Sequence, residues 1–77
     1  MQYSLEQLQE VVELATNFER EVERILRTGF PLENRPTVRK LLKRMVPYKK
    51  IFKHYIDRAI LKRGATGLEN IMPQELQ

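Results

Sequence analysis

Apolar side chains recur at alternating intervals of three and four residues in the first half of the chain. This spacing places them on one face of an amphipathic α-helix. Ser4 and Gln7 precede the stripe with the spacing of a capping box, in which each side chain satisfies a free backbone N–H of the first turn. The stripe consists of Leu8, Val11, Ala15, Phe18, Val22 and Ile25.

The end of this helix is marked by Gly29 and Pro31. Glycine readily takes the left-handed conformation that closes a helix, and proline prevents the helix from continuing. Phe30 is placed to fold back onto Ile25, as in a Schellman motif. The pattern therefore predicts a turn over residues 30–35, with Asn34 as the N-cap of the next helix.

The same 3,4 spacing returns and predicts a second helix from Pro36 to Arg63, where Gly64 follows as a stop signal. Pro47 lies inside it and would cost about 3 kcal/mol in a regular helix. The unbroken phase favours a continuous helix kinked at Pro47; a break into helices 36–45 and 47–63 remains open. The stripe contains Val38, Leu41, Met45, Tyr48, Phe52, Tyr55 and Ala59.

We expect an all-α fold in which the two long helices form an antiparallel hairpin over residues 1–64. Residues 65–77 form a C-terminal tail, where Thr66 and Glu69 permit one short helical turn; whether the tail docks or frays stays open. The apolar stripes are wider than a two-helix seam needs. The simplest way to bury the full width of these stripes is a homodimer that forms a four-helix bundle. Such a dimer would expose less of Val46, Ile51 and Leu61 than a monomer would.

The composition excludes several classes of function. The 77 residues contain no cysteine and one histidine, His54, so no disulfide framework, thiolate metal site, His-rich zinc site or Cys/His pair can form. Ser4, the one serine, is already assigned as a helix cap. We therefore predict no enzyme activity, no metal and no cofactor. The chain lacks an apolar segment long enough for a signal or membrane span, so we expect a cytoplasmic protein without membrane contact.

The net charge of +4 hides a strong asymmetry along the chain. Residues 1–30 carry six acidic and three basic side chains, whereas residues 31–64 carry eleven basic and two acidic ones. Such a split indicates an anionic partner for the basic half. On a single helix 36–63, the basic residues would cover the outer half of a positive rod. The candidate nucleic-acid-binding residues are Arg39, Lys40, Lys43, Arg44, Lys50, Lys53, Arg58 and Lys62.

Two functions from different classes fit this surface. The first is a small nucleic-acid-binding regulator or accessory protein that grips the phosphate backbone of DNA or RNA. The alternative is a protein–protein adaptor or inhibitor that docks a charged partner without nucleic acid. The aromatic residues Tyr48, Phe52 and Tyr55 share the phase of the core, so they are predicted to pack inside and not to stack on bases. A helix-turn-helix is not expected, because residues 45–48 contain no glycine.

Overall fold

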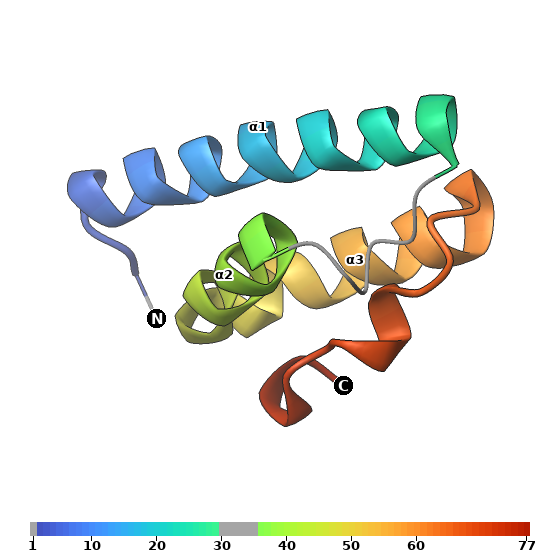
Figure 1. Ribbon diagram of the computed structural model, residues 1–77. Helices are drawn as coiled ribbons and strands as arrows, with labels where there is room; N and C mark the ends of the chain where they lie inside the picture. The colour runs from blue at the N-terminus through green and yellow to red at the C-terminus, as the bar shows by residue number, and fades with distance from the viewer. Residues whose placement is uncertain (1, 30–35) are drawn as a thin grey trace.

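The computed structural model describes residues 2–29 and 36–77, and these segments form helices joined by short turns, without a strand. The predicted all-α class is therefore confirmed for the described residues (Figure 1). Within these residues, three α-helices and three short 3-10 helices follow one another. They are α1 (Leu5–Thr28), α2 (Pro36–Met45), η2 (Val46–Tyr48), α3 (Lys49–Arg63), η3 (Leu68–Asn70) and η4 (Gln74–Leu76).

The capping signals of the first helix are confirmed. The Ser4 hydroxyl accepts a hydrogen bond from the backbone N–H of Gln7 at 3.1 Å, and the Gln7 side chain accepts one from Ser4 at 2.8 Å. Gly29 closes α1 with φ of +73°, a left-handed conformation that favours glycine. The predicted contact of Phe30 with Ile25 and the cap at Asn34 lie outside the described residues.

The second half of the hairpin is divided at the proline. The α-helix ends at Met45, passes through the 3-10 turn η2 and restarts at Lys49. The predicted continuous helix is therefore wrong, and a break at Pro47 describes the chain better. Pro47 occupies the first turn of η2, where its missing N–H has no helical partner to lose. Tyr48 then leaves the helical region, with φ of −113° and ψ of 32°.

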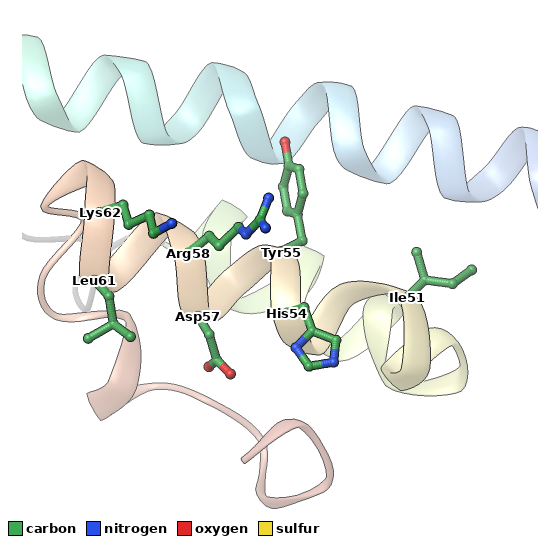
Figure 2. A pocket seen from close by; sticks show the side chains of 7 residues that line it. All are labelled: Ile51, His54, Tyr55, Asp57, Arg58, Leu61 and Lys62. Carbon is green, nitrogen blue, oxygen red and sulfur yellow. The ribbon is translucent and has the colours of Figure 1, made fainter.

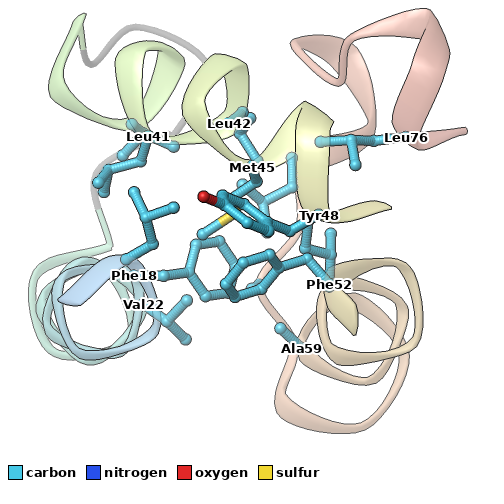
Figure 3. Close-up of a cluster of buried hydrophobic side chains, with 14 of the residues drawn as sticks. Phe18, Val22, Leu41, Leu42, Met45, Tyr48, Phe52, Ala59 and Leu76 are labelled. Atoms are coloured by element: carbon cyan, nitrogen blue, oxygen red, sulfur yellow. The ribbon is translucent and has the colours of Figure 1, made fainter. Parts of the chain in front are cut away.

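The helix α2 crosses α1 steeply and leads the chain back toward the start of α1 (Figures 1 and 3), so the helical hairpin is confirmed in this form. Thr37 at the start of α2 shares a surface hollow with Arg20 in the second half of α1. Arg44 near the end of α2 lies 3.6 Å from Glu10 in the first half of α1. The two helices therefore run in opposite senses, although α2 lies obliquely across α1 (Figures 1 and 3).

The helix α3 runs in the same direction as α1. Tyr48, directly before α3, contacts Glu10, whereas Tyr55 and Arg63 contact Glu19 further along α1. The turn at residues 46–48 therefore sends the chain back across the molecule. A two-helix hairpin would be about one helix diameter thick, 10–12 Å. The observed extents of 37 × 23 × 21 Å instead correspond to a third layer, which α3 and the tail supply.

All of these elements contribute to one hydrophobic core (Figure 3). The predicted core positions Phe18 and Phe52 are fully buried, Tyr48 is buried and Tyr55 is half-buried, so the aromatic stripe packs inside as expected. The tail is docked: Leu68 and Leu76 are buried in the same cluster. The other buried members are Leu14, Val22, Ile25, Val38, Leu41, Leu42, Met45, Ile56, Ala59 and Ala65.

The tail therefore covers part of the wide apolar stripe that the sequence assigned to a second copy of the chain. It does so through two 3-10 turns and not through the expected T-x-x-E cap, since Gly67 is the N-cap of η3 and no side chain bonds to it. Ile51 and Leu61 remain exposed, as expected for a monomer. Val46 is half-buried and packs against the core cluster.

Candidate nucleic-acid interface

A cluster of polar contacts joins the α2–α3 turn to α1. The Tyr48 hydroxyl donates a hydrogen bond to Glu10 at 2.6 Å, and this bond raises the pKa of Tyr48. Arg44 Nη2 lies 3.6 Å from Glu10 and 3.8 Å from Glu13. The ring of Tyr48 also packs on Tyr3, with 5.7 Å between the two ring centroids. The turn is therefore held from the side of α1.

A second cluster of the same kind lies further along α1. Arg63 Nη1 donates to Glu19 at 2.6 Å, and the Tyr55 hydroxyl donates to the same carboxylate. The hydrogen bonds from Arg63 and then Tyr55 lower the pKa of Glu19. Burial and the bond to Glu19 raise the pKa of Tyr55. The hydroxyls of Tyr48 and Tyr55 therefore both bond to acids of α1.

These clusters use acidic charge of α1 for internal pairing. Arg44, one of the eight candidate residues, belongs to the first cluster and faces α1. Lys40 lies on the same side of α2, in a hollow that it shares with Arg20 and Glu21 of α1. The structure thus separates Lys40 and Arg44 from the candidates on α3.

Arg39 and Lys43 occupy a different side of α2. They line a hollow together with Val46 and with Pro73 and Glu75 of the tail. A neighbouring hollow brings Glu75 next to basic residues of α3, namely Lys49, Lys50 and Lys53. The acidic residue that shares this hollow with Lys49 and Lys53 is therefore Glu75 of the tail. Two basic segments, one from each side of the turn, therefore flank the tail.

The remaining candidates lie on the exposed surface of α3, with Arg58 and Lys62 on the side that α1 passes (Figure 2). Arg58 and Lys62 line a shallow surface hollow of about 570 Å³ with His54, Asp57 and Leu61. Figure 2 shows His54 and Asp57 pointing away from α1. The exposed basic candidates of α3 lie on two sides of the helix, Lys50 and Lys53 toward the tail and Arg58 and Lys62 toward α1. Among the described residues, no carboxylate forms an ion pair with any of these four side chains.

The arrangement differs from the positive rod that the sequence suggested. The eight candidates lie on two helices with different directions, and they divide between the α1 side and the tail side of each helix. Sequence reasoning identified the residue types but placed them on one continuous helix. The sequence also did not predict the three-residue turn between α2 and α3, which contains no glycine. Glycine is not needed there, because every non-glycine residue of the described chain keeps a negative φ.

Comparison with protein families, with curated proteins and with solved structures gives no match for this chain. Over residues 2–29 and 36–77, no helix is both long enough and apolar enough to cross a membrane. In the same residues, no three histidine or acidic side chains gather into a metal-binding group.

Proposed function

We propose that this protein binds nucleic acid through the exposed surface of α3. One observation supports this proposal most: the basic side chains of this surface have no carboxylate partner in the described chain, whereas Arg44 and Arg63 are paired with acids of α1. A phosphate backbone attracts exposed basic side chains that lie along one helix without acidic partners. Asp57 is the one acidic residue of α3.

The spacing of the basic residues suits several phosphates. With a rise of about 1.5 Å per residue, Lys50 and Lys62 are about 18 Å apart along the helix axis. Duplex DNA carries one charge per about 1.7 Å of its axis, so a surface of this length meets several phosphates at once. Neutralising four of them would give a slope of about −3.6 for log K against log salt concentration. The proposed role is that of a small regulator or accessory protein.

The test compares two variants that lose the same charge. Lys53→Gln/Arg58→Gln removes two bases from α3, and Arg20→Gln/Arg24→Gln removes two exposed bases from α1. Binding of a labelled 25-bp duplex is measured by fluorescence anisotropy between 50 and 200 mM salt. We expect the α3 variant to bind more weakly, with a slope shallower by about 1.8, and the α1 variant to match the wild type.

Two results would count against nucleic-acid binding. The first is that neither DNA nor RNA binds the wild type at 50 mM salt, where electrostatic attraction is strongest. The second is that both double variants lose the same affinity, which would indicate a dependence on net charge alone. Either result would place the adaptor function first, with a charged protein as the partner of the basic surface.

We also propose that the protein forms a homodimer. Support comes from the first half of α1, where Leu5, Leu8 and Val12 are 72%, 46% and 65% exposed at helical spacing. Pairing of α1 with its copy through these residues would bring two hairpins together, as in the four-helix bundle predicted from the sequence.

Sedimentation equilibrium tests the dimer. We expect a mass near twice the 9.2 kDa of the chain at micromolar concentration. Leu8→Glu/Val12→Glu should shift the mass toward the monomer, because a charge in the apolar seam has no partner. Leu61→Glu, a change at an exposed leucine of α3, is the control. A wild-type mass of 9.2 kDa throughout the concentration series would rule the dimer out.

A further inference from the structure

The helices α2 and α3 are joined by only three residues and have very different directions. Figure 3 views α1 and α3 nearly end-on and α2 from the side. Two steeply inclined helices with a three- or four-residue connection are the arrangement of a helix-turn-helix, whose second helix enters the major groove of DNA. We infer that α3 inserts into the major groove of duplex DNA and contacts base edges. This inference rests on the proposed nucleic-acid binding and specifies its substrate.

The turn between the two helices is held without glycine. Tyr48 is buried, its hydroxyl donates a hydrogen bond to Glu10, and its ring packs on Tyr3. Pro47 fixes its own φ within the turn. The angle between α2 and α3 is therefore set by side-chain contacts with α1, so that the two helices present a fixed surface to a ligand.

The core holds α3 from one side, and the tail flanks a second side, where Glu75 shares a hollow with Lys50 and His54. Phe52, Ile56 and Ala59 are buried, and together they define the inward face of the helix. His54 lies on the outward face, and Lys50 and Lys53 in the same first half of α3 are exposed beside it. In a recognition helix, the N-terminal residues are the ones that contact base edges. The donors needed for such contacts are therefore present in this half of α3.

The dimensions select duplex DNA over duplex RNA. An α-helix with its side chains is about 10–12 Å across, and the major groove of B-form DNA is about 12 Å wide. The major groove of A-form RNA is too narrow and deep for a helix to enter. Lysine can donate hydrogen bonds to guanine O6 and N7. The preceding helix, α2, carries the exposed Lys43, which can contact a phosphate of the same duplex.

The first experiment compares four probes with the full chain: a 20-bp duplex DNA, the duplex RNA of the same sequence, and the DNA with either groove blocked. Glucosylated 5-hydroxymethylcytosine fills the major groove, and netropsin fills the minor groove. We expect the duplex DNA to bind at least tenfold more tightly than the RNA, and the glucosylated DNA to bind at least tenfold more weakly than plain DNA. Netropsin should leave binding unchanged.

Equal affinity for the DNA and RNA duplexes, or full binding to the glucosylated DNA, would overturn insertion of α3 while leaving nucleic-acid binding intact. Loss of binding with netropsin would move the contact to the minor groove and would overturn it as well. Absence of binding to all of the nucleic acids would instead refute the proposed function. The two failures are therefore distinguishable.

A second experiment tests base contacts. A pool of randomised duplexes is selected with the wild type, and the ratio of affinities for the enriched and a scrambled sequence is measured. Lys50→Ala/His54→Ala should reduce this ratio at least tenfold. The control, Arg20→Ala/Gln9→Ala, removes one charge and one polar side chain from α1 and should keep the ratio. A pool without enrichment, or an unchanged ratio in the α3 variant, would overturn base reading by α3.

Discussion

Leu76 provides a sharp test of whether the tail is part of the core. Its side chain is 1% exposed, whereas that of Leu61 on the outer face of α3 is 83% exposed. A Leu→Ala change at a buried site costs about 2–5 kcal/mol, because it loses buried apolar surface and leaves a cavity. The same change at an exposed site stays within about 0.5 kcal/mol. Leu76→Ala and Leu61→Ala are therefore a matched pair that differs mainly in burial.

The expected effect is large for a chain of this size. A 77-residue domain has a total unfolding free energy of roughly 4–12 kcal/mol. Each kcal/mol of lost stability lowers the Tm of a domain of this size by about 4–8 °C. A loss of about 2 kcal/mol or more in Leu76→Ala should therefore lower the Tm by at least about 8 °C. Leu61→Ala should melt with the wild type in the same circular-dichroism experiment at 222 nm. Equal melting temperatures for the two variants would refute the docked tail, since the core would then close without Leu76.

Three further changes test other parts of the fold. Phe52→Ala should lower the unfolding free energy by about 3–5 kcal/mol in chemical denaturation, and an unchanged value would contradict its place in the core. The pKa of Glu19 is lowered in the folded state, so its contribution is present above the ordinary value of 4.5 and is lost as the pH falls below it. Thermal melts from pH 3 to 6 should accordingly show a weaker acid dependence for Glu19→Gln than for the wild type, and parallel curves would contradict the pairing. Gly64→Ala should lower the unfolding free energy by about 1–2 kcal/mol in thermal melts, because the φ of Gly64 is +71°. The whole cost comes from the backbone, since no atom lies within 4 Å of the added Cβ. A neutral effect would contradict the left-handed cap.

The features that the sequence predicts correctly depend on neighbours along the chain. Ser4 and Gln7 are three residues apart, and their reciprocal hydrogen bonds form within one helical turn. Gly29 and Gly64 end helices because their own backbone takes a positive φ. The start of α2 at Pro36 follows from the fixed φ of proline. Signals of this kind need no knowledge of the tertiary fold.

The turn at Pro47 could not be predicted in the same way. The apolar phase runs through residues 45–48 because both α2 and α3 face the same core, so the pattern looks like that of one helix. The reversal depends on Tyr48, whose burial and bond to Glu10 join residues 38 positions apart in the chain. A helical wheel contains no information about such contacts.

In the candidate site, too, local features could be predicted from the sequence and tertiary contacts could not. The sequence identifies the basic residue types, since they are visible as a run of charge. It could not show that Arg44 pairs with Glu10 while Lys53 stays without an acidic partner among the described residues. That difference arises from the direction in which α2 and α3 pass α1, which is set by the turn.

Contact between phosphates and the exposed basic residues of α3 can be measured through the salt dependence of DNA binding. The affinity for a 25-bp duplex is followed against salt for the wild type, for Lys53→Gln/Arg58→Gln and for Arg20→Gln/Arg24→Gln. We predict a wild-type slope of about −3.6, a slope shallower by about 1.8 for the α3 variant, and a wild-type slope for the α1 variant. Identical slopes for all three proteins, or no binding by the wild type at 50 mM salt, would contradict this contact.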